Sequence, residues 1–517
     1  MKLTRYILAA LTVWATVLPT VAQTDVDATI TAVRKVIKNH ERNALPFVES
    51  EILSKYKKNA EVLTAIAGAC DDFDSTLTFS YIDKVFAVNA NYVPAYIVKG
   101  KSYRRRGDYD QALLWFDKAI AANPNDSTGY LAYADVLVRQ GDLDGAAQKM
   151  ASQLQYNPTS NIYAEIGVMY TDYGGMDYVN EAISSFEKAD VSRMTSGQVE
   201  KYVRLLHAAG SSGAGVGAYN RADSILDMAL LKYPSNANLN RLMLKNSVTV
   251  KKYDKALDAA DALFNKSDSL TIDLDDFLNY GSAYIGLRRY DDAIAMYHKC
   301  IDFEIKREDY KSDVLYDRAK KDEFKNKGKA MEKIVEAYNA MGYTDEAIAE
   351  YGKYIEYKKD AGILSSADLN NFAIQYSKQA EILNGEEKLS AYRKSFEIFG
   401  EMARLALTED GMLDNAVIGY VQRVILAANI LDRERKEQLA VPDAEEIVKL
   451  CPVDSELNRT QLSCLKTAVR YLILVYDDQK QYKRKGIYWK ILGQLDPTEE
   501  LYSVYNNPAA RRKMGIR

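Results

Sequence analysis

One period constrains the fold of this chain more than any other feature, because the same residue types recur at intervals of 34 residues. Pro158 follows Pro124 by 34 residues, and Gly141 follows Gly107 by the same interval. The aligned positions are Tyr96, Gly100, Tyr103, Gly107, Ala112, Phe116, Ala119 and Pro124 in one copy and Tyr130, Ala134, Leu137, Gly141, Ala146, Met150, Gln153 and Pro158 in the next. A period of roughly 20 to 50 residues is typical of arrays whose units bury their apolar faces against each other.

The residue sizes within one copy suit two packed helices. Gly100 and Ala112 allow the first and second helix of a unit to approach closely, while Tyr103 and Phe116 fill the space around that contact. In Asn123-Pro124-Asn125-Asp126-Ser127 the proline ends one helix, and the polar side chains can cap the next. The pattern therefore predicts a series of helix-turn-helix hairpins.

This order of large, small, aromatic, alanine and proline residues resembles the tetratricopeptide repeat. The resemblance is most specific at 93–160, strong at 274–361 and weaker elsewhere between 59 and 499. It implies an all-α fold, a right-handed superhelical α-solenoid of antiparallel helix pairs. In the last pair Lys485 stands where the repeat usually has alanine, which predicts looser packing.

Register and composition divide the chain into successive segments. We expect a signal peptide at 1–22, an N-terminal helical cap at 23–58, an N-terminal repeat array at 59–199, a central array at 200–361 with a charged insertion near 302–329, divergent helical repeats at 362–465, a C-terminal repeat at 466–499 and a tail at 500–517. The insertion contains Lys320-Lys321-Asp322-Glu323 and is predicted to form a solvated helix. In the divergent part we expect longer helix pairs with core residues Phe372, Tyr376, Phe396, Phe399, Tyr420 and Ile425.

The first residues have the pattern of an export signal. Basic residues precede a mostly apolar run from Ile7 to Leu18, and Ala22 offers a small residue before a predicted cleavage. The alternative, an uncleaved anchor, is disfavoured because the run is short for a bilayer span. We therefore expect an exported bacterial protein, periplasmic or secreted after cleavage, with association to the outer membrane as a narrower expectation. The residue directly after the predicted cleavage is Gln23 rather than cysteine, so nothing indicates a lipoprotein.

Cysteine and charge narrow the range of partners. Cys451 and Cys464 could form a disulfide in an oxidising compartment, but burial of all four cysteines as small apolar residues is the favoured interpretation. The net charge of −4, from 68 basic and 72 acidic residues, supplies no field that would attract nucleic acid.

No constellation typical of catalysis or metal binding is present in the sequence. The three histidines, His40, His207 and His298, have no zinc-binding spacing. The glycine-rich stretch 210–217 follows a predicted helix and is not followed by GK[ST], so we interpret it as an inter-helix turn rather than a phosphate loop. We expect a protein that is not an enzyme and that holds no cofactor or metal.

The resemblance also implies where a partner would bind. In tetratricopeptide repeats the first helix of each pair lines a concave groove, and the corresponding positions here are Ile97, Lys101, Arg104, Arg105, Leu131, Asp135, Val138 and Arg139. Stacking of Arg139 beside Arg105 predicts a local anion-binding strip, although ordinary solvated arginines at a helix end are the favoured alternative. The Lys and Asn positions with which chaperone-binding members grip a C-terminal carboxylate are Ile97 and Lys101 here, which argues against that activity.

These observations favour a non-catalytic scaffold or adaptor of the bacterial cell envelope that binds a protein or peptide in its groove. A narrower form is a role in outer-membrane protein assembly or export, with peripheral association to outer-membrane proteins. The alternative is a carbohydrate- or nutrient-binding accessory protein of the outer membrane. Such proteins usually carry exposed tryptophan platforms, whereas this chain has Trp14, Trp115 and Trp489 alone. A hydrolase is a third, disfavoured hypothesis because helical hairpins claim nearly the whole chain.

Overall fold

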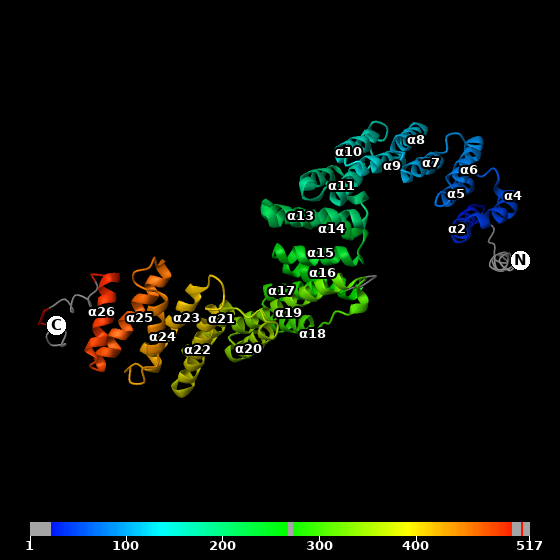
Figure 1. Ribbon diagram of the computed structural model, residues 1–517. Coiled ribbons are helices and arrows are strands. Elements are labelled where there is room, and N and C mark those ends of the chain that lie inside the picture. Colours follow the sequence, from blue (N-terminus) through cyan, green and yellow to red (C-terminus); the bar gives the residue numbers. More distant parts are fainter. Residues whose placement is uncertain (1–21, 267–271, 499–507, 510–517) are drawn as a thin grey trace. The chain divides into compact units, whose positions relative to one another are not determined.

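The computed structural model describes residues 22–266, 272–498 and 508–509, and in this part of the chain all regular structure is helical (Figure 1). The fold class expected from the sequence, an all-α solenoid of helix pairs, is confirmed. The chain forms two compact units, Met1–Asn246 and Ser247–Arg517, and the division falls within α15.

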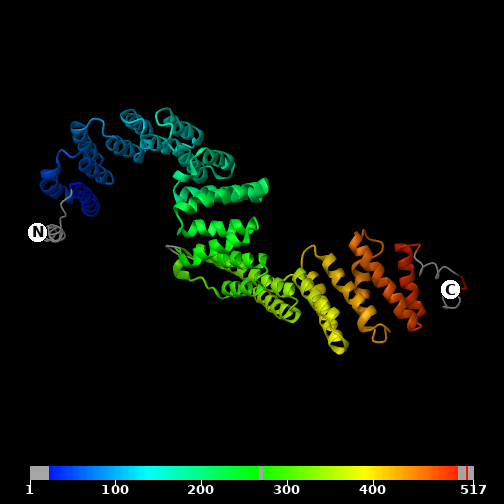
Figure 2. The same ribbon diagram turned by 180° about the vertical axis from the view of Figure 1, so that it is seen from behind.

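The first unit begins with a cap of α-helices that precedes the repeats. Its helices are α2 (Ala22–His40), α3 (Leu45–Phe47), α4 (Leu53–Tyr56), α5 (Ala60–Cys70), α6 (Ser75–Val88), α7 (Val93–Arg105), α8 (Tyr109–Ala122), α9 (Ser127–Arg139), α10 (Leu143–Ala151), α11 (Ile162–Tyr173), α12 (Val179–Lys188), α13 (Ser196–Ala209), α14 (Gly215–Lys232) and α15 (Ala237–Thr249). Consecutive helices from α5 to α14 pack as hairpins, which Figures 1 and 2 show as pairs lying side by side.

The second unit contains both regular and longer hairpins. Its helices are α16 (Tyr253–Lys266), α17 (Leu274–Gly286), α18 (Tyr290–Asp302), α19 (Asp313–Met341), α20 (Thr344–Asp360), α21 (Ser366–Ile382), α22 (Gly385–Ala406), α23 (Leu413–Leu426), α24 (Val441–Leu450), α25 (Arg459–Asp478) and α26 (Tyr482–Leu495). The expected longer pair in the divergent part is found as α21 and α22, with 17 and 22 residues.

Close contact at the small-residue positions explains the repeat pattern. A Cβ atom added at Gly100 would lie 2.4 Å from the ring of Phe116, and one added at Gly281 would lie 2.4 Å from the ring of Tyr297. Phe116 and Tyr297 are fully buried. The glycine of the first helix therefore makes room for the aromatic ring of the second, as the sequence predicted.

The turn between the two helices of a pair needs one residue in the left-handed region. Gly107 and Gly141 occupy it with φ of 79° and 83°. Lys251, Arg288 and Lys480 occupy the equivalent turns of later pairs with φ of 61°, 58° and 59°. The turn geometry is thus kept where glycine is lost, at a conformational cost that glycine avoids.

Partly buried polar contacts with Asn246 of α15 lie beside the connection between α13 and α14. The glycine-rich stretch forms the turn expected there, with Gly213 and Gly215 at positive φ. His207 Nε2 lies 3.0 Å from Asn246 Oδ1, and Asn246 Nδ2 donates to the Tyr219 carbonyl at 3.1 Å. Burial lowers the pKa of His207, so the neutral imidazole is favoured in this contact.

Several predictions about core and surface need correction. Glu323, expected on a solvated helix, is 5% exposed in α19 because it pairs with Lys320 at 2.7 Å and Lys327 at 3.1 Å. Lys485 does not loosen the last hairpin, since it is 3% exposed, pairs with Asp477 and lies over the Trp489 ring.

Most expected core residues of the divergent part are at least half-buried, but Ile425 is not. Phe396 and Phe399 are buried, and Phe372, Tyr376 and Tyr420 are half-buried. Ile425 is exposed because its neighbours Val424 and Leu426 occupy the inward positions of α23.

All four cysteines are free and buried, as the favoured interpretation predicted. Cys451 and Cys464 form no disulfide.

Candidate partner-binding groove

A cavity of about 440 Å³ opens among the first helices of the N-terminal unit. Its walls come from α2, α5, α7 and the start of α9, so the cap helix and the first members of successive hairpins contribute together. In a stacked-hairpin array this is the set of helices expected to carry a partner-binding groove. We call this cavity the N-terminal pocket.

The floor of the N-terminal pocket is apolar and made of small side chains. Helix α5 contributes Ala65, Gly68 and Ala69 on one face, and α7 contributes Ile97 and Val98. A Cβ atom at Gly68 would lie 3.8 Å from the nearest atom of Val98, which is an ordinary contact, so the floor is open rather than plugged. Side chains of this size let the backbone or an apolar group of a ligand approach closely.

The two basic groups of the pocket wall lie on α2. Arg34 and Lys38 are one helical turn apart and exposed, and neither forms an ion pair with the residues described in this structure. The helix that carries them is anchored because Ile30, Val33 and Ile37 belong to the same core cluster as residues of α5.

The two carboxylates of the pocket are already engaged. Asp126 caps α9, accepting hydrogen bonds from the Thr128 amide at 2.9 Å and the Thr128 hydroxyl at 2.7 Å. Asp72 accepts from Arg105. The two carboxylates of the pocket therefore have hydrogen-bond partners, whereas its two basic groups have no ion-pair partner among the described residues.

The structure places the predicted groove residues in different environments. Ile97 is buried and lines the N-terminal pocket. Lys101 is exposed on α7. Leu131 and Val138 are half-buried and pack against the core between α9 and α11. The apolar members of the predicted set thus contribute as much to packing as to a surface.

The remaining predicted residues form ion pairs with each other and with the turn that follows α5. Asp135 pairs with both Arg104 and Arg139, and Arg105 pairs with Asp71 at 3.2 Å and with Asp72. Burial, followed by repulsion from Arg139 and Arg105, lowers the pKa of Arg104. Carboxylates compensate these arginines, so the hypothesis of a local anion-binding strip gains no support.

Sequence reasoning missed Arg34 and Lys38 because α2 lies outside the 34-residue register. No position of the family motif could be carried over to it. One usable signal was present: Ile30, Val33 and Ile37 recur at helical spacing and leave Arg34 and Lys38 on another face.

Trp115 is not an open platform for a sugar ring. The Lys99 and Lys118 ammonium groups lie over its ring at 4.2 and 3.9 Å from the centroid, and Phe86 and Tyr96 stack beside it. Trp489 is buried. Neither tryptophan presents the uncovered face that stacking on a carbohydrate needs.

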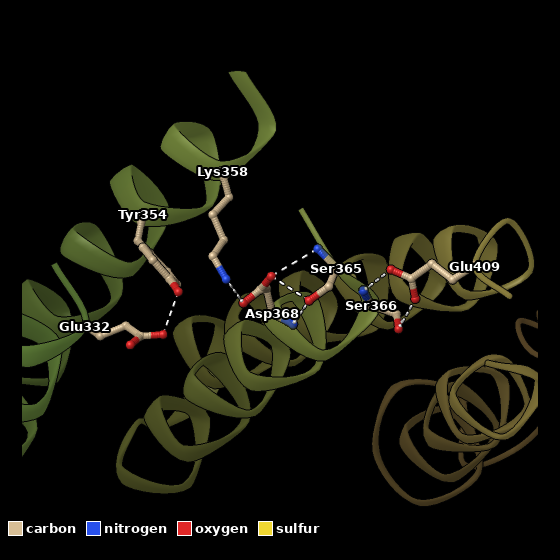
Figure 3. Close-up of polar contacts among 7 residues, drawn as sticks. All are labelled: Glu332, Tyr354, Lys358, Ser365, Ser366, Asp368 and Glu409. Carbon is tan, nitrogen blue, oxygen red and sulfur yellow. Dashed lines mark hydrogen bonds and ion pairs between the residues drawn. The ribbon is translucent and has the colours of Figure 1, made fainter. Parts of the chain in front are cut away.

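Serine, lysine and carboxylate side chains, residue types that hydrolases use, gather at the start of α21 (Figure 3). The Ser365 hydroxyl donates to Asp368 at 2.6 Å in a helix cap, and Lys358 pairs with Asp368 at 2.6 Å. The Ser366 hydroxyl donates to Glu409 at 2.5 Å. These contacts tie α20 and the turn after α22 to the start of α21, which gives the cluster a structural role.

Tyr354 extends the same cluster towards α19. Its hydroxyl donates to Glu332 at 2.5 Å, and burial followed by this bond raises the pKa of Tyr354 (Figure 3). The phenol therefore stays protonated and acts as a hydrogen-bond donor between α20 and α19.

Among the described residues we find no group of three or more His, Cys, Asp or Glu side chains arranged to hold a metal ion. In the same ranges none of the helices has the length and hydropathy of a membrane span.

Comparison with known families identifies the repeats. Residues 97–157 and 277–304 match family models of the tetratricopeptide repeat. The first match lies in the N-terminal unit and the second in the C-terminal unit. No curated protein matches the chain significantly.

Solved structures that match the chain include tetratricopeptide-repeat proteins. The C-terminal part of a TPR repeat-containing protein from Cytophaga hutchinsonii is 18% identical, with 59% of this chain and 98% of that chain covered and a TM-score of 0.38. PilF of Pseudomonas aeruginosa is 15% identical, with coverage of 42% and 96% and a TM-score of 0.26. YrrB, a TPR protein with an unusual peptide-binding site, is 17% identical, with coverage of 37% and 94% and a TM-score of 0.23.

Proposed function

We propose that this tetratricopeptide-repeat chain is a non-catalytic scaffold that binds a protein partner through the first helices of its N-terminal hairpins. Stacked helix pairs commonly present such a surface to extended or helical peptides. The observation that carries the proposal is the N-terminal pocket, whose apolar floor lies on α5 and α7, the first helices of two hairpins, and whose basic residues lie on the cap helix α2.

Site-specific photocrosslinking tests this proposal. A photoreactive amino acid at Ala69, on the pocket floor, should crosslink a discrete partner in cells. The same probe at Ser80, exposed on α6, serves as the matched control. Equal labelling at both positions, or no partner at Ala69, would argue against a groove at this place.

We further propose that the scaffold works in the bacterial cell envelope. The export signal pattern at 1–22 supports this location. Fractionation of cells that express the full chain should find the processed protein outside the cytoplasm, and deletion of 1–22 should retain it inside.

A narrower form of the proposal assigns the scaffold to outer-membrane protein assembly or export. Deletion of the gene should then lower the amounts of outer-membrane proteins while leaving cytoplasmic proteins unchanged. Unaltered outer-membrane composition would remove this narrower form and leave the scaffold role intact.

A further inference from the structure

The geometry points to the chemistry of the ligand: we propose that the N-terminal pocket binds an internal peptide segment in which an acidic side chain stands next to an apolar one. This inference rests on the proposed scaffold function and assigns its ligand class. Three features of the pocket carry it, namely the basic residues on α2, the small apolar floor and the two carboxylates of the lining that already accept hydrogen bonds.

The basic wall calls for negative charge. Arg34 and Lys38 lie one turn apart, so their Cβ atoms are separated by about 6 Å, and no carboxylate of the described residues pairs with either. Arg105, by contrast, is compensated by Asp71 and Asp72. A ligand carboxylate at this wall would gain charge-assisted hydrogen bonds without displacing an existing partner.

The floor and the two carboxylates of the lining restrict which anion fits. Ala65, Gly68 and Ile97 would contact an apolar side chain, which a free phosphate or a nucleic-acid backbone does not offer. Asp126 and Asp72 also line the pocket, so they would repel a multiply charged anion more strongly than a singly charged carboxylate. A singly charged carboxylate beside an apolar group meets both requirements.

Selection from a random library of seven-residue peptides displayed internally, with both ends fused to carrier sequence, tests the inference. The wild-type protein should enrich peptides in which Asp or Glu neighbours Leu, Ile, Val or Phe. The double variant Arg34→Glu and Lys38→Glu should enrich Lys or Arg at the same place. For an acidic peptide selected by the wild type, this variant should weaken binding at least tenfold.

The matched control is Lys35→Glu with Lys58→Glu, because both lysines are exposed and lie outside the pocket while the change in net charge is equal. It should keep the acidic preference and change affinity less than twofold. Circular dichroism and thermal melting of both variants check that the helices are intact.

The possible results separate the two levels of the proposal. Enrichment of peptides without acidic residues, or an acidic preference that survives the Arg34 and Lys38 reversal, overturns the ligand class and leaves the scaffold proposal standing. No enrichment at all, together with an unlabelled Ala69 crosslinker, overturns the scaffold proposal as well. A peptide that binds only with a free C-terminal carboxylate would assign the basic wall to chain ends and refute an internal ligand.

Discussion

Substitution of Gly100 by alanine tests the packing rule on which the fold depends. The added methyl group would lie 2.4 Å from Cε1 of the Phe116 ring, whereas ordinary contacts begin near 3.4 Å. The ring, which is fully buried, would have to move by about 1 Å within a packed core. We therefore expect Gly100→Ala to open the hairpin of α7 and α8 even though alanine favours helix.

The magnitude follows from two opposing effects. Overpacking by one methyl group costs about 1–3 kcal/mol, and the higher helix propensity of alanine returns about 1 kcal/mol. Gly486→Ala in α26 is the matched control, because a Cβ atom there meets nothing within 4 Å. The control gains the propensity without the clash, so the two variants should differ by about 1–3 kcal/mol.

Hydrogen exchange measured by mass spectrometry suits this comparison because repeat arrays need not unfold in a single two-state step. The local opening constant of α7 and α8 should rise in Gly100→Ala, while that of α26 should fall in Gly486→Ala. The changes in the two variants should together span roughly five- to 150-fold. Slower exchange in α7 and α8 of Gly100→Ala would refute the argument that the glycine makes room for Phe116.

Four further outcomes are expected. Arg288→Gly should raise the stability of the C-terminal unit by about 1 kcal/mol in chemical denaturation, since Arg288 adopts a φ of 58° that glycine adopts without strain. Asp135→Ala should increase retention on a heparin column, because it frees two arginines, while lowering stability by less than about 1 kcal/mol. All four thiols should resist Ellman's reagent in the folded protein and react after unfolding, since each is buried. Because the pKa of His207 is depressed below 6.5, its contribution to stability is present above pH 6.5 and lost as pH falls through the depressed pKa, so melting of His207→Gln should depend less on pH below 6.5.

The parts of the fold that the sequence predicted are those fixed by size and spacing. Gly100 lies against the Phe116 ring as expected, because the missing side chain leaves room for the ring, and Gly281 lies against Tyr297 in the same way. The cysteines were correctly expected in the core, since an unpaired cysteine packs there as a small apolar side chain.

The sequence was less informative at positions where the fold keeps a turn or a buried site without the residue type that usually marks it. Arg288 and Lys480 occupy the turn position that holds glycine in the early repeats. The sequence therefore lacks the glycine that would identify the turn, although the backbone still has a positive φ. Glu323 and Lys485 are buried because each meets an opposite charge, which no single-residue preference foretells. Arg34 and Lys38 became candidates through the position of α2, which lies outside the repeat and follows from tertiary packing.

The contribution of α2 to the N-terminal pocket links binding to the integrity of the cap. Both basic residues of the pocket belong to this helix, which packs into the core of the first unit through Ile30, Val33 and Ile37. A ligand that contacts Arg34 and Lys38 within the pocket binds only the state in which α2 is packed against α5. Binding therefore shifts the equilibrium between packed and detached α2 towards the packed state. Resistance of the first helix to limited proteolysis would then rise with ligand concentration and report occupancy without a labelled partner.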